Sequence, residues 1–121
     1  MDSPEHREIL VGVVGPCGSG KSTLIAGLEQ AGFACRHIAQ EHSYVPAMWQ
    51  LITNPDFLIF LLASFTVCTE RRRLNWSEAD YKEQLRRLSH ARQHADLIIE
   101  TDTLAIPEVL DRALAFLRQH A

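Results

Sequence analysis

The sequence predicts one α/β domain in which helices cover both faces of a parallel β-sheet, giving three layers. Short apolar runs rich in β-branched residues alternate along the chain with stretches whose apolar residues recur at helical spacing. A glycine-rich segment, residues 15–22, joins the first apolar run to the first helical stretch. The 121 residues are enough for one hydrophobic core but too few for a second, so we expect residues 1–121 to form a single domain.

The first half of the chain predicts two strands and two helices. Residues 9–14 are a continuous apolar run, which is typical of a parallel strand buried on both faces. Residues 22–31 contain strong helix formers and end before a glycine, a common helix stop. Residues 33–39 predict a second, shorter strand. Residues 45–52 then place apolar side chains at helical spacing before an Asn-Pro pair, which predicts a short helix.

The second half contains the strongest strand and helix signals. Residues 56–64 predict the third strand, and the charged residues 66–74 after it predict a helix. Ser77 is expected to open a longer helix, because an acidic residue three positions later completes a capping box. Residues 95–100 predict the last strand, and Pro107 suits the first turn of a closing amphipathic helix. We therefore expect four parallel strands.

Composition and charge exclude several classes of protein. The chain is 46% hydrophobic and 22% charged with five prolines, which is typical of a globular protein. A net charge of −3 does not suit a protein that binds duplex nucleic acid, so no nucleic-acid partner is expected. The three cysteines are widely spaced without a CxxC pair, which predicts neither disulfides nor a zinc site and favours a cytoplasmic location. The longest apolar run is too short to cross a bilayer, so no membrane is expected.

Residues 15–22, which we call the glycine loop, read Gly-Pro-Cys-Gly-Ser-Gly-Lys-Ser and match the P-loop pattern G-x-x-x-x-G-K-[ST]. Glycines let the backbone curl so that its N–H groups point at phosphate oxygens, and the start of the following helix favours negative charge. The alternative is a turn that only joins strand to helix. The residues predicted to bind the phosphates are Gly15, Cys17, Gly18, Ser19, Gly20, Lys21, Ser22 and Thr23.

Three side chains of this segment have individual roles in the prediction. Lys21 is expected to reach the β- and γ-phosphates of a nucleoside triphosphate, and the Ser22 hydroxyl to coordinate Mg²⁺. Thr23 is placed to contact the α-phosphate. The chain lacks an NKxD-like motif that would read guanine, and ATP is taken as the expected nucleotide.

The loop and two later segments resemble the nucleoside and nucleotide monophosphate kinase group of P-loop proteins. Residues 57–71 resemble the fourth strand of that group and the helix after it, whose arginine and lid contact the transferred phosphate. The resemblance implies a P-loop NTPase fold and Arg71 as the lid arginine, with Arg72 and Arg73 as neighbours. Residues 96–109 resemble the final strand and the adenine-cradling loop, which implies that Thr103 contacts the nucleotide.

Two departures from the group bear on the sheet order and the acceptor site. In the group, the strand beside the P-loop strand ends in an acid that holds Mg²⁺ through water, but residues 57–64 end without a carboxylate. Only residues 40–54 stand where the group places its third strand and acceptor-binding helices. If that strand is missing, the sheet order is 2-1-3-4. If residues 57–64 are instead the acid-bearing strand, the order is 2-3-1-4, which the missing carboxylate disfavours.

Glu41 is the candidate replacement for the missing acid. It follows the second strand, at the sheet edge where open α/β sheets bind ligands. Gln40, Glu41 and Trp49 faintly resemble deoxyribonucleoside kinases, which use a glutamate after this strand as general base toward the acceptor hydroxyl. A solvated loop carboxylate is the alternative. Gln40, His42 and Tyr44, in the same turn, could line an acceptor site or simply face water.

The leading functional hypothesis is phosphoryl transfer from Mg-ATP to a small hydroxyl or phosphate acceptor, with Lys21, Glu41 and Arg71 as catalytic residues. One alternative is a nucleotide-binding module without kinase activity, in which the nucleotide orders residues 40–54 or 71–77 to gate a partner. Another is slow hydrolysis of the nucleotide. A homodimer that hides the apolar helix predicted over residues 45–52 is also left open.

Overall fold

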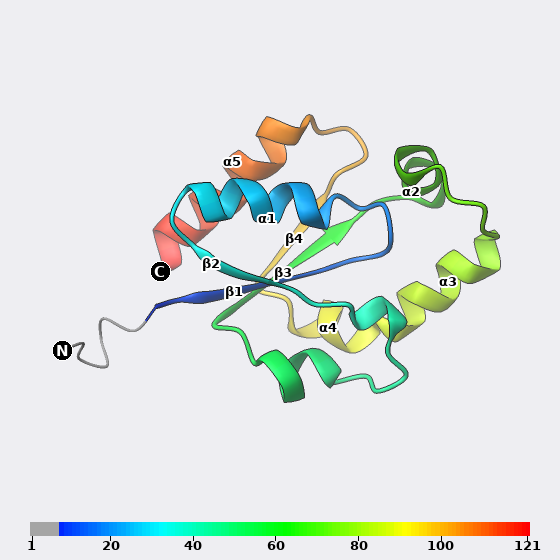
Figure 1. The fold of residues 1–121 in the computed structure, drawn as a ribbon, viewed down its shortest axis with the longest axis horizontal. Helices are drawn as coiled ribbons and strands as arrows, with labels where there is room; N and C mark the ends of the chain where they lie inside the picture. Colours follow the sequence, from blue (N-terminus) through cyan, green and yellow to red (C-terminus); the bar gives the residue numbers. More distant parts are fainter. Residues whose placement is uncertain (1–7) are drawn as a thin grey trace.

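The computed structural model describes residues 8–121 and contains one parallel β-sheet (Figure 1). Its strands are β1 (Leu10–Val14), β2 (Ala34–His37), β3 (Phe57–Leu62) and β4 (Leu97–Glu100). The order along the sheet is β2-β1-β3-β4, because β1 pairs in parallel with both β2 and β3, and β4 pairs with β3. The predicted order 2-1-3-4 is thus confirmed and the alternative 2-3-1-4 is wrong.

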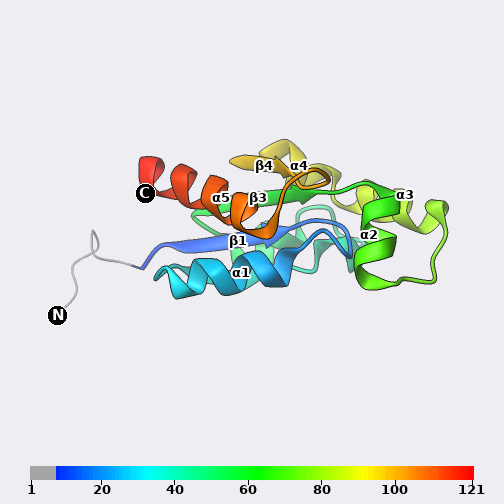
Figure 2. The same cartoon turned by 90° about the horizontal axis from the view of Figure 1, so that it is seen from above.

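Helices cover both faces of the sheet, as Figures 1 and 2 show. One face carries α1 (Lys21–Gln30) and the closing helix α5 (Ile106–His120), which contact each other. The opposite face carries α3 (Glu78–Arg87) and α4 (Ser89–His94). Helix α2 (Phe65–Arg72) lies beyond the carboxyl end of β3. The predicted three-layer α/β arrangement is confirmed.

The core consists of two apolar layers, one on each face of the sheet. Neighbouring residues of a strand point to opposite faces, so each strand supplies both layers. Val11, Val13, Ile59 and Leu61 pack with buried residues of α1 and α5. On the other face the cluster contains Val14, Ile38, Trp49, Leu58, Phe60, Leu88 and Ala91. Burial on both sides explains why β1 and β3 are continuous apolar runs rather than alternating ones.

Helix α5 follows its predicted pattern. Leu117 is buried, and Val109, Leu110 and Leu114 pack half-buried against the same layer, as their spacing predicted. Pro107 lies in the first turn, where its missing N–H is harmless. No helix in the described part of the chain combines the length and apolarity needed to cross a bilayer.

The predicted helix over residues 45–52 begins later than expected. The structure has a 3₁₀ turn, η2 (Gln40–His42), then irregular turns and a single π-helical turn, η3 (Trp49–Thr53). The buried Gln40 side chain is the physical reason: its amide nitrogen donates to Val45 O at 2.9 Å, and its oxygen accepts the Trp49 N–H at 2.8 Å. In a helix that began at Val45, its carbonyl oxygen would accept the Trp49 N–H. The Gln40 amide bonds to both of these backbone groups instead, so the first helical turn does not form there.

The capping box predicted at the start of α3 is confirmed. The Ser77 hydroxyl accepts the Asp80 N–H at 3.1 Å, and the Asp80 carboxylate accepts the Ser77 N–H at 3.0 Å. Tyr81, Leu85 and Leu88 face inward as a stripe, with Leu88 fully buried. The box places α3 so that its inner face reaches the glycine loop, as described below.

Candidate functional site

A pocket of about 720 Å³ opens where the carboxyl ends of the strands meet the start of α1. We call it the central pocket; its volume is in the range of small-molecule sites. Several elements contribute to its walls: the glycine loop, α1, the turn after β2, the end of α2 and the loop between β4 and α5. The lining residues include Cys17, Gly18, Ser19, Gly20, Lys21, Ser22, Thr23, His37, Glu41, His42, Arg71, Arg72, Thr101, Leu104, Val109 and Leu110.

The glycine loop has a conformation that needs glycine at two positions. A Cβ on Gly15 would lie 2.4 Å from the carbonyl oxygen of Leu61, which is far inside van der Waals contact. Gly18 has a φ of +85°, and a Cβ there would lie 2.5 Å from the carbonyl oxygen of Cys68. The loop is therefore pressed against the end of β3 and against α2, so side chains cannot fit between them.

Replacing Gly18 by alanine is expected to destabilise the fold through that contact. Gly32→Ala is the matched control, because Gly32 also has a positive φ of +98° but open space around its Cβ. The control carries only the backbone strain, about 1–3 kcal/mol. Gly18→Ala should lose about 1 kcal/mol or more beyond that, the usual cost of overpacking. Equal losses of unfolding free energy in denaturant titrations would show that the glycine loop does not pack on Cys68 as described.

Lys21 is buried at the centre of this site. Its side chain is 6% exposed, and its Nζ donates to the carbonyl oxygens of Gly15 at 2.6 Å and Pro16 at 3.0 Å. The ammonium also pairs with Glu41 Oε2 at 3.0 Å, and Glu41 is only 2% exposed. A buried cation needs a compensating anion, and Glu41 supplies it. Parallel pairing of β1 with β2 brings the two residues together, because it puts both strand ends at one edge.

Two buried polar atoms at the pocket have no hydrogen-bond partner. They are Ser19 Oγ and Glu41 Oε1, and both residues line the pocket. Buried oxygens without a partner are rare in proteins, and each usually marks a water, ion or ligand position. Among the described residues no side chain caps the N-terminus of α1, and its first turn holds no acid. The positive end of the helix therefore faces the pocket together with Lys21, which suits an anion.

Arg71 ties three parts of the site together. Its Nη1 donates to Thr101 Oγ1 at 2.9 Å and to Ser19 O at 3.3 Å, and its Nη2 donates to Thr101 O at 2.9 Å. Arg71 and Arg72 both line the pocket, whereas Arg73 ends α2 with a positive φ of 50°. The structure thus brings the predicted arginine to the glycine loop, and Thr101 holds its guanidinium there.

Thr103 and Asp102 lie in the loop after β4. Thr103 is exposed and is not among the lining residues, although Thr101 and Leu104 on either side are. Asp102 Oδ1 accepts the N–H of Ser64 at 2.8 Å, so a carboxylate does stand next to the end of β3, supplied by the neighbouring strand. Asp102 does not line the pocket either, and Glu41 is the carboxylate that contacts Lys21.

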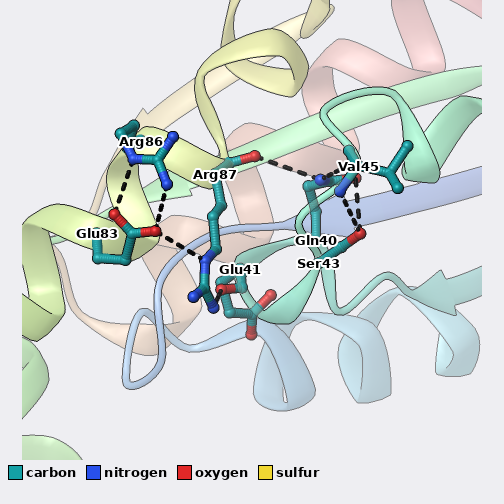
Figure 3. Close-up of polar contacts among 7 residues, drawn as sticks. All are labelled: Gln40, Glu41, Ser43, Val45, Glu83, Arg86 and Arg87. Carbon is teal, nitrogen blue, oxygen red and sulfur yellow. Dashed lines mark hydrogen bonds and ion pairs between the residues drawn. The ribbon is translucent and has the colours of Figure 1, made fainter.

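The turn that carries Glu41 is fixed from behind by α3 (Figure 3). Arg87 donates from Nη1 to Glu41 O at 3.4 Å and pairs with Glu83 through Nε at 3.2 Å. The guanidinium also lies 4.2 Å from the ring centre of Tyr44, which is itself 80% exposed. Gln40, buried beneath the turn, donates to the carbonyl oxygen of Arg87 at 3.3 Å. Gln40, Tyr44 and Arg87 therefore position the turn, and Glu41 and His42 are its pocket residues.

Gln84 is a residue that the sequence analysis missed. From the buried face of α3 its Oε1 accepts the Cys17 N–H at 3.0 Å, and its Nε2 donates to Cys17 Sγ at 3.3 Å. These contacts hold the tip of the glycine loop. A glutamine within a strongly charged helix carries no local signal of such a contact, because the two residues are 67 positions apart.

Trp49 packs with His90 and His94, and Trp76 belongs to a separate aromatic group. Trp49 is buried, and its Nε1 donates to His90 Nδ1 at 3.0 Å. His94 stacks on His90 with ring centres 4.3 Å apart. Trp76 donates to Thr69 Oγ1 at 2.7 Å and contacts Phe65 and Tyr81. Both tryptophans therefore have packing roles outside the central pocket.

Burial controls the protonation of several groups near the site. Burial, and next the charge of Lys21, lower the pKa of His37, so the imidazole on the pocket wall favours its neutral form. Burial raises the pKa of Cys68 to about 11 and that of Cys35 to about 11. These two thiols are therefore protonated at neutral pH, unlike a reactive cysteine.

The central pocket brings together most of the residues that the sequence singled out. Cys17 to Thr23, Glu41 and Arg71 all line it, whereas Gly15 and Thr103 are not among the lining residues. A buried ammonium group and an uncapped helix start can together hold a multiply charged anion. The adjacent carboxylate is the counter-ion of the ammonium group that such an anion would replace. Comparison with protein-family models finds no family that matches the chain, and comparison with curated proteins finds no significant match.

Proposed function

We propose that the chain is a P-loop protein that binds Mg-ATP in the central pocket and transfers the γ-phosphoryl group to a small hydroxyl or phosphate acceptor. The observation that carries this proposal is the environment of Lys21: a buried ammonium group at the uncapped start of α1, neutralised by Glu41. The G-x-x-x-x-G-K-S pattern at this strand-to-helix junction supports it independently.

Nucleotide binding is an exchange of counter-ions in this proposal. The β- and γ-phosphate oxygens take over from Glu41 as the anionic partner of Lys21 and also accept N–H groups at the start of α1. The buried Ser19 hydroxyl, which lacks a partner, is available to donate to a phosphate oxygen. The buried ammonium group then has an anionic partner at all times. In the nucleotide-free chain the partner is the Glu41 carboxylate, and in the nucleotide complex it is phosphate.

The residues present fit Mg²⁺, which prefers oxygen ligands. The proposed oxygen donors are the exposed hydroxyl of Ser22, the last residue of the glycine loop, and the carboxylate of Glu41; both residues line the central pocket. When bound with the nucleotide, Mg²⁺ would neutralise charge on the phosphate oxygens. The unpartnered Glu41 Oε1 is the observation that favours Glu41 over Asp102 for this role.

Transfer requires a base for the acceptor and positive charge for the phosphoryl group. Once the phosphates hold Lys21, the Glu41 carboxylate is free to accept the proton of an acceptor hydroxyl. Arg71 and Arg72 supply positive charge from the end of α2, with Arg71 oriented by Thr101. These groups act by position and charge and need no covalent intermediate.

The apolar part of the lining of the central pocket suits a nucleobase. It is formed by Gly27 of α1 and by the apolar residues Leu104, Ala105, Ile106, Val109 and Leu110. An apolar wall beside a charged one matches a ligand with a flat ring at one end and phosphates at the other. The loop of residues 101–105 is the one that the kinase resemblance assigns to adenine.

Incubation with Mg-ATP and a panel of nucleosides, nucleotides and sugars tests the transfer reaction. We expect ADP release that depends on one acceptor class and is absent in Lys21→Ala, which controls for contaminating enzymes. ADP release without any acceptor would replace transfer by hydrolysis. Binding without turnover would replace it by a non-catalytic module, and failure to bind any triphosphate would refute the site.

The second candidate, a nucleotide-controlled binding module, has one observation in its favour. Glu41 is adjacent to Gln40, whose amide fixes the backbone at Val45 and Trp49. The segment beyond presents exposed apolar side chains, among them Leu51 and Ile52. Release of Glu41 from Lys21 would therefore act on a turn that is joined to an apolar surface, which is what a gated partner site requires.

A further inference from the structure

We propose that Cys17, Glu41 and His42 form a binding site for Zn²⁺ at the edge of the central pocket. The three side chains each offer one ligand atom, and these atoms all lie within 4.8 Å of one another. Cys17 comes from the glycine loop and the other two from η2, so the site joins two elements that parallel strand pairing brings together. It shares Glu41 with the Mg²⁺ position proposed above, so the zinc site is proposed for the chain without nucleotide.

The ligand spacing is close to that of a tetrahedral zinc centre. Cys17 Sγ and His42 Nε2 are 3.5 Å apart. Bonds of about 2.3 Å to sulfur and about 2.0 Å to nitrogen at a tetrahedral angle place these two atoms about 3.5 Å apart. His42 Nε2 and Glu41 Oε2 are 3.9 Å apart. A nitrogen and an oxygen bound to one tetrahedral zinc ion lie about 3.4 Å apart, as the usual Zn–N and Zn–O bond lengths require. The His42 side chain is 60% exposed, so it has room to close that difference.

The second oxygen of the Glu41 carboxylate is a further observation in favour of a cation site. Its Oε2 pairs with Lys21, but its Oε1 is buried and makes no hydrogen bond. A buried carboxylate oxygen without a partner costs free energy, and a metal ion is one of the partners that removes this cost. Because the 3.9 Å separation from His42 Nε2 belongs to Oε2, a metal ion and Lys21 would share this carboxylate, and Oε1 supplies the second oxygen that such sharing needs.

The chemistry of the donor set selects zinc over magnesium. A thiolate, an imidazole nitrogen and a carboxylate together are typical zinc ligands, whereas Mg²⁺ prefers oxygen alone. Gln84 donates to Cys17 Sγ at 3.3 Å and so orients the sulfur, which is the kind of outer contact that supports metal sites. Solvent reaches the exposed His42, so water completes the fourth position. The spacing of the cysteines predicted no zinc site. Such spacing identifies only ligands that are close in the sequence, and the ligands proposed here come from two separate elements.

Binding changes the protonation of one ligand. The Cys17 Sγ–H bond breaks as the Zn–S bond forms, and the proton passes to the buffer, while His42 binds through a neutral ring nitrogen and zinc loses water molecules. No oxidation or reduction occurs. Calorimetric titration of Zn²⁺ in two buffers of different ionisation enthalpy should therefore show proton release on binding, and less of it in Cys17→Ser.

Titration of the nucleotide-free full chain with Co²⁺, a spectroscopic substitute for zinc, tests the site. We expect a sulfur-to-cobalt charge-transfer band that saturates at one metal per chain and that Zn²⁺ removes. Cys17→Ser should abolish the band, and His42→Gln should weaken Zn²⁺ binding by about tenfold or more. The matched controls are Cys35→Ala, a buried thiol outside the cluster, and His94→Gln, an exposed histidine on α4; both should bind like the parent chain.

Absence of the sulfur band in the parent chain would overturn the proposal. So would a band that persists in Cys17→Ser, since that places the metal on Cys35 or Cys68. Circular dichroism of each variant shows whether it is folded, and His42→Gln, at an exposed position, tests the site without changing a residue of the glycine loop. The titration contains no nucleotide, so its outcome is independent of the proposed phosphoryl transfer.

Discussion

Lys21→Ala is expected to abolish binding of Mg-ATP, with a loss of affinity of about a hundredfold or more. Hydrogen bonds to a charged group contribute about 1.5–3 kcal/mol each, and the ammonium would contact two phosphates. A loss of about 3 kcal/mol or more corresponds to over a hundredfold in Kd. Equilibrium dialysis with labelled nucleotide measures the change. Lys82→Ala, which removes an exposed lysine of α3, is the matched control and should bind like the parent chain.

The same substitution leaves Glu41 buried without its partner, so lost binding has to be separated from lost folding. Breaking one side of a buried pair costs about 3–5 kcal/mol of stability. The double variant Lys21→Ala with Glu41→Gln removes the orphaned charge. It should regain part of the unfolding free energy and still fail to bind nucleotide. Recovery of binding in the double variant would contradict the assignment, because it would make Lys21 a structural residue only.

Glu41→Gln is expected to reduce turnover by about a hundredfold to ten-thousandfold, the usual range for loss of a general base. Nucleotide affinity should change far less than turnover. Loss of the carboxylate removes one proposed oxygen donor for Mg²⁺, but it also removes the anion that competes with phosphate for Lys21. Steady-state kinetics on the acceptor found in the panel, together with equilibrium dialysis, separates the two effects. Glu29→Gln, an exposed position on α1, is the control.

Two outcomes would contradict this role for Glu41. Unchanged turnover in Glu41→Gln would make the residue a counter-ion for Lys21 and nothing more. A parallel loss of binding and turnover would mean that Glu41 positions the nucleotide rather than the acceptor. The variant also leaves Lys21 with carbonyl partners alone, so its stability without nucleotide should fall and Mg-ATP should restore it.

The sheet was predictable from sequence for a physical reason. Strands buried on both faces have to be continuously apolar, and this marks β1 and β3 without knowledge of their neighbours. The missing carboxylate after β3 was enough to choose between the two sheet orders. The helix expected over residues 45–52 failed because Gln40, outside that window, takes the backbone groups of Val45 and Trp49. A helical pattern of apolar residues gives no information about a side chain outside it that hydrogen-bonds to the backbone.

Part of the candidate site was likewise predictable from the sequence, and part was not. Glu41 could be placed at the correct sheet edge, because every strand of a parallel sheet ends on one side. Its ion pair with Lys21 depends on the path of a three-residue turn, which the sequence does not encode locally. The contacts of Gln84 with Cys17 and of Thr101 with Arg71 span 67 and 30 residues. Only the folded chain shows them.

The most direct test of the central claim, that the glycine loop binds a polyphosphate beside Lys21, is equilibrium dialysis of the parent chain with labelled Mg-ATP and two competitors. We predict one saturable site per chain, from which inorganic tripolyphosphate displaces the nucleotide and adenosine at the same concentration does not. The contrary result is clear. If no triphosphate is retained, or if adenosine displaces Mg-ATP and tripolyphosphate does not, the loop is not a phosphate site.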